Sequence, residues 1–151
     1  MPPVHIILTG GQTGVDRAAL DVAIELGIPV RGWCPAGRWA EDRRIDDRYP
    51  LTETPSAGTA ERTEWNVRDS SGTLILARRP LVGGTALTAE VARRLGRPLL
   101  VVDPADRSRR ADVADWLAKR TIALLNVAGP RESTCPGIYQ QAATFLRALL
   151  A

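Results

Sequence analysis

Three glycine-rich turns hold the residues of this chain whose types and spacing could bind a ligand. The first turn contains Gly10, Gly11, Gln12, Thr13 and Gly14, followed by Asp16 and Arg17; the second contains Gly83, Gly84, Thr85 and Thr88; the third contains Asn126, Gly129, Arg131, Glu132 and Ser133. Glycine lets the backbone approach a ligand closely, and the free N–H groups at the start of a helix favour an anion. The turns therefore predict a site for a phosphate-bearing ligand.

Each turn follows a stretch with the composition of a buried strand and precedes a stretch with helical spacing. The predicted strands are 4–9, 29–33, 73–77, 98–103 and 122–127; the predicted helices are 15–26, 60–69 with Thr59 as N-cap, 86–95, 109–120 and 137–150. This alternation predicts one α/β domain over residues 1–151, a Rossmann-like three-layer α-β-α sandwich with a mostly parallel sheet of about five or more strands. Ligands bind such sheets beyond the carboxyl ends of the strands, where the three turns would meet.

The span from Cys34 to Thr59 shows neither pattern, and a structureless span of this length in a compact domain is usually functional. It contains Arg38, which we expect to contact the ligand, and the carboxylates Glu41, Asp42 and Glu53. Glu41 and Asp42 could serve acid–base chemistry, although adjacent carboxylates on a loop are more often simply solvated.

The turns also have purely structural interpretations, which remain open at this point. A Gly-Gly pair after a strand can serve tight geometry alone. Asp16 could contact a ribose or pterin donor, or could be a first-turn acid that complements the helix dipole. Arg17 could bind a phosphate or form a surface ion pair.

Composition excludes several classes of protein. The 151 residues carry a net charge of only +3, with basic and acidic residues interleaved, which does not indicate a nucleic-acid partner. Two cysteines about a hundred positions apart, Cys34 and Cys135, indicate neither a metal site nor a disulfide framework. No apolar run approaches the ~20 residues of a membrane span, and no signal peptide is evident, so we expect a cytoplasmic protein.

The first turn matches neither the P-loop, whose Lys is missing, nor G-x-G-x-x-G, which argues against an ATPase or a standard dehydrogenase.

Four blocks resemble the molybdenum cofactor carrier family. They are GGQTGVDRAALD at 10–21, GWCPAGRWAED at 32–42, PLVGGT at 80–85 with Thr88, and LNVAGPRES at 125–133 with PGIY at 136–139. The resemblance covers nearly the whole chain. It implies a Rossmann-like fold in the group that includes the cytokinin-activating phosphoribohydrolases, and a homo-oligomer, either tetramer or dimer. It also implies binding and protection of the molybdenum cofactor, a phosphorylated molybdopterin, with transient contact to molybdoenzymes.

One departure separates the chain from the phosphoribohydrolases, which read roughly Gly-Gly-x-Gly-Thr-x-x-Glu. Thr88 stands where their catalytic Glu would fall. Hydrolysis of a glycosidic bond needs a positioned carboxylate, so the departure favours a binding protein. Two alternatives stay open: a phosphoribohydrolase that uses Glu41, Asp42 or Glu53, and a nucleotide-sensing module. The apolar last helix predicts either a subunit interface or a helix covered by its own domain.

Overall fold

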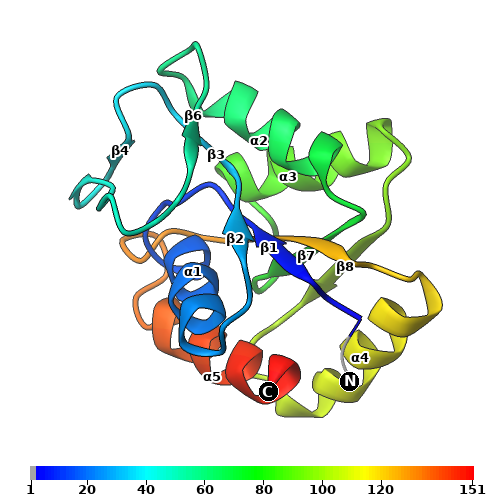
Figure 1. Cartoon of the computed structure of the whole chain (residues 1–151). Helices are drawn as coiled ribbons and strands as arrows, with labels where there is room; N and C mark the ends of the chain where they lie inside the picture. The colour runs from blue at the N-terminus through cyan, green and yellow to red at the C-terminus, as the bar shows by residue number, and fades with distance from the viewer. Residues whose placement is uncertain (1–2) are drawn as a thin grey trace.

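The central sheet has five strands, all parallel, as the alternation of elements predicts. The structure, a computed structural model, describes residues 3–151 (Figure 1). The strands are β1 (Ile6–Leu8), β2 (Val30–Arg31), β7 (Gly72–Leu76), β8 (Leu99–Val102) and β9 (Leu124–Ala128), in the order β2-β1-β9-β7-β8. The chain thus returns to insert its last strand between the first and the third strand of the sheet.

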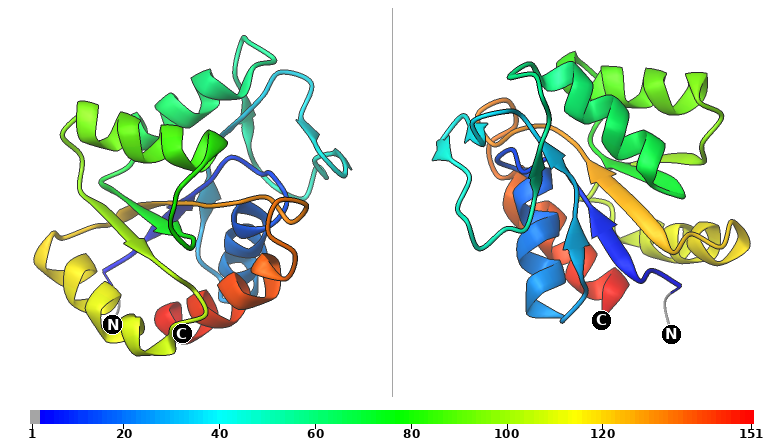
Figure 2. Two further views of the ribbon diagram at one scale, coloured as in Figure 1. Left: turned by 180° about the vertical axis from the view of Figure 1, so that it is seen from behind. Right: turned by 45° about the horizontal axis from the view of Figure 1, so that its top comes forward.

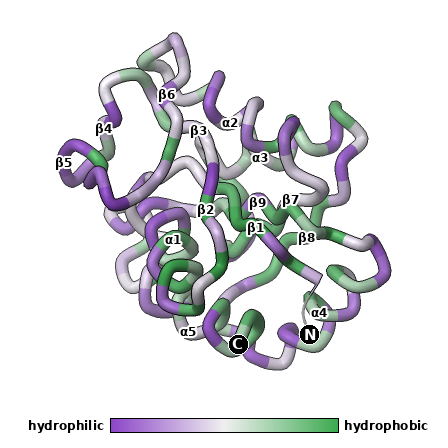
Figure 3. The backbone as a smooth tube through the Cα atoms, viewed as in Figure 1, coloured by the Kyte–Doolittle hydropathy of each residue, from purple (hydrophilic) through white to green (hydrophobic). Residues whose placement is uncertain are grey.

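Helices cover both faces of this sheet, which makes the Rossmann-like prediction correct (Figure 2). One face carries α1 (Val15–Glu25), α4 (Arg110–Lys119) and α5 (Ile138–Leu150); the other carries α2 (Thr59–Asp69) and α3 (Gly83–Arg94). A three-residue 3-10 helix, Arg107–Arg109, precedes α4. Strands covered on both faces need apolar residues at every position. All five residues of β7 are accordingly buried, and the central strands consist largely of apolar residues (Figure 3).

Element boundaries differ from the predicted ones where a glycine controls the backbone. The strand predicted over 29–33 ends at Arg31 and is followed by Gly32, which has a positive φ of 138°. A Cβ at Gly32 would come within 2.1 Å of the Thr9 carbonyl oxygen, so only glycine fits there. Helix α3 begins at Gly83, three residues before the predicted start, so the second glycine-rich turn is itself the first helical turn. Thr59 is the first residue of α2, and Gly58 takes the N-cap position.

The segment between β2 and α2 is ordered by short strand pairs and one buried arginine. Trp33–Cys34 (β3) pairs in parallel with Thr52–Glu53 (β6), and Trp39–Ala40 (β4) pairs antiparallel with Arg43–Arg44 (β5). The Arg38 guanidinium donates hydrogen bonds to four carbonyl oxygens of the segment, those of Ile45, Asp46, Tyr49 and Leu51. The prediction of a structureless span is therefore wrong, because hydrogen bonds to one side chain replace a regular ladder.

Helix α5 is covered by its own domain. Its apolar residues pack on α1 and the sheet, and Phe145, Leu146 and Ile138 are at most 1% exposed. The large apolar side chains exposed in the described part of the chain, Ile24, Trp39, Val82 and Leu95, all lie elsewhere. The apolar surplus of α5 thus does not indicate a subunit interface. None of the helices described for residues 3–151 has the length and apolar composition needed to cross a membrane.

A matched pair of isoleucine substitutions tests the placement of the core. Ile75 in β7 is fully buried, whereas Ile24 in α1 is 47% exposed. We expect Ile75→Ala to lower the free energy of unfolding by about 2–5 kcal/mol, since it leaves a cavity, and Ile24→Ala to lower it by less than about 1 kcal/mol. Urea denaturation measures both. Equal losses in the two variants would contradict the packing described here.

Candidate ligand-binding site

A cavity of about 250 Å³ opens at the carboxyl ends of β1, β9 and β7, where all three glycine-rich turns meet. It lies at the point where the chain order reverses: β1 leads outward to β2, and β7 leads outward to β8. Open parallel sheets bind ligands at such points. The lining residues are Gly10, Gln12, Asp16, Thr59, Arg62, Thr63, Asn66, Val82, Gly83, Gly84, Thr85, Thr88, Asn126, Val127, Ala128, Gly129, Pro130, Arg131 and Thr134.

The N-terminus of α3 forms one wall of the cavity. No side chain caps this helix, and the backbone N–H groups of its first residues, Gly83 to Thr85, have no partner within the helix. A Cβ built at Gly83 or at Gly84 would meet no atom within 4 Å. Nothing in the fold fills the space beside these glycines, which leaves the helix start open to an anion.

A polar face of α2 forms a second wall, and the sequence prediction missed it. Thr59, Arg62, Thr63 and Asn66 line the cavity, at the i, i+3, i+4, i+7 spacing of one helical face. The Arg62 Nη1 donates to the Gly10 carbonyl oxygen at 3.0 Å, which holds the guanidinium against the first turn. The spacing of these four residues was a usable signal, because a helix that packs on a sheet would normally have an apolar stripe there.

Glu41 joins the first turn to the third from outside the cavity. Its carboxylate accepts hydrogen bonds from Thr13 Oγ1 and Ser133 Oγ, and from the Ser133 backbone N–H at 3.1 Å. The Gln12 Oε1 in turn accepts from the Glu41 N–H at 2.9 Å. The hydrogen bonds that the carboxylate accepts from Ser133 and Thr13, with a contribution from Arg131, hold the pKa of Glu41 below its ordinary value. Glu41 therefore supports the turns as a carboxylate.

Several predicted site residues also serve as supports and do not line the cavity. Arg17 pairs with Asp42 at 2.9 Å and donates to the Gly11 carbonyl, and Arg38 lies inside the segment between β2 and α2. The Glu132 carboxylate accepts from the N–H groups of Gly137 and Tyr139, which caps α5. At Gly14 a Cβ would come within 2.3 Å of the Pro130 carbonyl oxygen, so this glycine lets the first and third turns pack together. Gly11, Thr13 and Ser133 do not line the cavity either. The structure brings ten of the predicted residues to it: Gly10, Gln12, Asp16, Gly83, Gly84, Thr85, Thr88, Asn126, Gly129 and Arg131.

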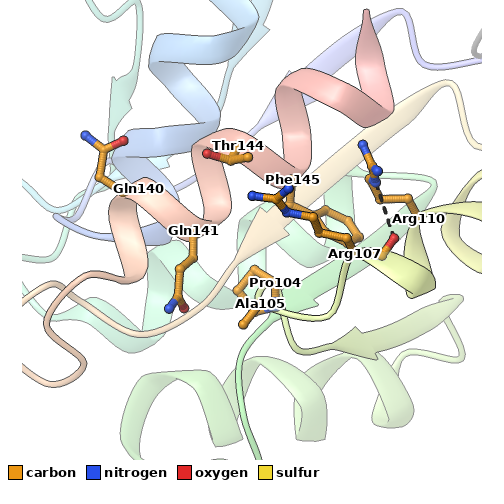
Figure 4. A pocket seen from close by; sticks show the side chains of 8 residues that line it. All are labelled: Pro104, Ala105, Arg107, Arg110, Gln140, Gln141, Thr144 and Phe145. Carbon is orange, nitrogen blue, oxygen red and sulfur yellow. Dashed lines mark hydrogen bonds between the residues drawn. The ribbon is translucent and has the colours of Figure 1, made fainter.

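A second cavity, of about 330 Å³, lies between α5 and the segment that follows β8 (Figure 4). Its walls include Arg107, Arg110, Gln140 and Phe145, and the Arg110 Nε donates to the Arg107 carbonyl at 3.3 Å. None of the three glycine-rich turns contributes to it. The first cavity, with its backbone donors, is therefore the better candidate for a phosphate. Within residues 3–151 no cluster of three or more His, Cys, Asp or Glu residues is arranged to hold a metal ion.

The fold and the cavity define a Rossmann-like domain with a candidate anion site at the reversal point of its sheet. Residues 7–150 match the circularly permutated YpsA SLOG family, and the chain belongs to that family. It is also similar to the crystal structure of the "Putative molybdenum carrier protein" from Syntrophus aciditrophicus SB. That similarity has a TM-score of 0.97 and 42% sequence identity, over 99% of this chain and 97% of the other. The resemblance seen in the sequence blocks is thereby confirmed. No curated protein matches the chain.

Neutralising Glu41 tests its supporting role. Because the folded-state pKa of Glu41 lies below its ordinary 4.5, the charged form contributes stability above about pH 4.5, and the contribution disappears as the pH falls through the folded-state value. We expect Glu41→Gln to lower the free energy of unfolding by up to about 1 kcal/mol at pH 7, since solvent screens the carboxylate of this exposed residue, and by less below pH 4. Urea denaturation across pH measures this, with the exposed Glu90→Gln as control. A pH-independent difference would contradict the assignment.

Proposed function

We propose that this chain binds the molybdenum cofactor, a phosphorylated molybdopterin, in the cavity at the strand ends and holds it as a carrier. The observation that carries the proposal is the uncapped N-terminus of α3, whose first residues, Gly83 to Thr85, line the cavity beside the open space at Gly84. The similarity to a protein named as a molybdenum carrier supports the choice of ligand.

The charges around the cavity suit the phosphate end of such a ligand. Arg62 and Arg131 line the cavity, whereas Asp16 is the one carboxylate among its lining residues. A helix N-terminus attracts an anion through its free N–H groups and its dipole, and a nearby guanidinium strengthens this attraction. We therefore assign the phosphate to the backbone of Gly83, Gly84 and Thr85.

The three carboxylates that the sequence offers for hydrolysis, Glu41, Asp42 and Glu53, are engaged elsewhere, which supports retention of the ligand. Asp42 pairs with Arg17, Glu53 accepts from the Gly37 N–H, and Glu41 bridges the turns. Thr88, at the position of the phosphoribohydrolase Glu, donates its hydroxyl to the Gly84 carbonyl at 2.8 Å. No base of the expected kind therefore reaches the ligand from these positions.

Delivery of a carried cofactor requires transient contact with a molybdoenzyme, and we include this contact in the proposal. We also propose a homo-oligomer, a dimer or a tetramer, as the family resemblance implies. Light scattering of the purified protein measures the mass of the assembly directly.

Substitution of Gly84 separates binding from folding. An Ala side chain at this position meets open space in the protein, and Ala favours a helix over Gly by roughly 0.5–1 kcal/mol. We expect Gly84→Ala to leave the stability unchanged or slightly raised. We expect it also to lower the amount of pterin that co-purifies from a molybdopterin-producing host at least about tenfold, because the methyl group occupies the phosphate position.

Fluorescence of the oxidised pterin released from the purified protein measures this retention. Arg120→Ala, an exposed substitution at the far end of α4, is the control and should retain as much pterin as the unsubstituted protein. Full retention by Gly84→Ala would contradict the placement of the phosphate, and absence of pterin from all three proteins would contradict the carrier function.

Incubation with nucleoside monophosphates tests the hydrolytic alternative. Since Thr88 replaces the catalytic Glu and the other candidate carboxylates are engaged, we expect no release of free base from adenosine or guanosine monophosphate. Chromatography of the products checks this, with Thr88→Glu as the comparison variant. Release by the unsubstituted protein would favour a phosphoribohydrolase.

A further inference from the structure

Asp16 has an unusual position among the residues that line the cavity. It is only 7% exposed, and its Oδ2 accepts one hydrogen bond, from the Gln12 N–H at 3.2 Å. No Arg, Lys or His of the described residues lies within ion-pair distance of it. The other oxygen, Oδ1, accepts no hydrogen bond of normal geometry from residues 3–151. An ionised carboxylate can accept about four hydrogen bonds, so most of the capacity of Asp16 is unused.

The surroundings of Asp16 do not supply the donors that its carboxylate lacks. Burial raises the pKa of the carboxyl above its ordinary value, although Arg62, the Gln12 N–H and the nearby Thr9 hydroxyl act in the opposite direction. The Thr9 Oγ1 is itself buried without a well-formed hydrogen bond. A buried carboxylate with unused acceptor sites is costly unless something in the cavity donates to it. This makes Asp16 a place where a ligand has to supply donors.

The topology separates Asp16 from the proposed phosphate position. Asp16 lies in the first turn of α1, which follows β1, and Gly84 in the first turn of α3, which follows β7, with β9 between these strands. Two steps between neighbouring strands correspond to about 10 Å. A phosphate would be repelled by the Asp16 carboxylate, so the end of the ligand that reaches Asp16 is uncharged or positive. This separation suits a molecule with a phosphate at one end and a hydrogen-bonding ring at the other.

We propose that Asp16 recognises the ring N–H and the adjacent exocyclic amino group of a 2-amino-4-oxopyrimidine ring, the unit that pterins and guanine share. This inference rests on the proposed function and names the part of the ligand that the cavity selects. The two donors of this ring lie side by side and match the two oxygens of a carboxylate, as a guanidinium does.

Other rings match the carboxylate less well. Hypoxanthine keeps the ring N–H but lacks the amino group, and so offers one donor. Adenine offers its amino group next to a ring nitrogen that is itself an acceptor and repels the carboxylate. The affinities of the corresponding monophosphates should therefore fall in the order guanosine, inosine, adenosine.

Titration calorimetry with guanosine, inosine and adenosine monophosphate and with neopterin phosphate tests the inference. We expect the unsubstituted protein to bind guanosine monophosphate and neopterin phosphate at least about tenfold more tightly than adenosine monophosphate, with inosine monophosphate between them. In Asp16→Asn the guanosine and pterin affinities should fall about tenfold or more, while the affinity for adenosine monophosphate changes less than about threefold. The exposed Asp115→Asn serves as the control and should behave as the unsubstituted protein.

Two results would overturn the inference while leaving the phosphate site intact. One is equal affinity of the unsubstituted protein for all three nucleotides, a measurement that needs no variant to fold. The other is an equal loss for all ligands in Asp16→Asn, the result expected if Asp16 contacts a ribose or has a structural role. If the unsubstituted protein binds none of the four phosphates, the proposed function fails and this inference fails with it.

Discussion

The insertion of β9 between β1 and β7 is the constraint on which the site depends. Parallel strands with right-handed connections send the helices after β1 and β7 to opposite faces of the sheet, and the returning strand places a third turn between their starts. Main-chain hydrogen bonds along all three strands fix this order. The strand order alone therefore brings three segments around one cavity: the first turn, the N-terminus of α3 and the turn after β9.

Charged groups are divided between the wall of the cavity and its support. Arg62 and Asp16 line the wall. Arg38, by contrast, donates hydrogen bonds to carbonyl oxygens, and Arg17 forms an ion pair with Asp42. Glu41 does not line the wall itself, but it contacts two wall residues, Gln12 and Arg131. It also holds Thr13 and Ser133 together. Supports of this kind keep donors in fixed positions before a ligand arrives, which lowers the cost of ordering them on binding.

Much of the fold could be predicted because short local patterns of residue type mark its strands and helices. Continuous apolar runs such as residues 73–76 indicate strands covered on both faces, and glycines that follow amphipathic stretches mark helix ends. The start of α3 was predicted too late, since Gly83 and Gly84 are poor helix formers and begin this helix only in the tertiary context. An arginine near a glycine-rich turn can serve a ligand or a loop, and only the positions of its acceptors separate the two. The structure shows Arg38 bound to carbonyl oxygens of its own segment and Arg17 paired with Asp42.

The sequence by itself determined the class of fold, the three glycine-rich turns and the family, since these depend on residue types and short spacings. Only the tertiary structure decided which side chains face the cavity. Arg62 lies more than fifty positions from Gly10, yet its guanidinium donates to that carbonyl, because α2 crosses the sheet above the end of β1. Whether a side chain lines a wall or supports it depends on contacts between segments remote in the chain, and local spacing carries no information about those contacts.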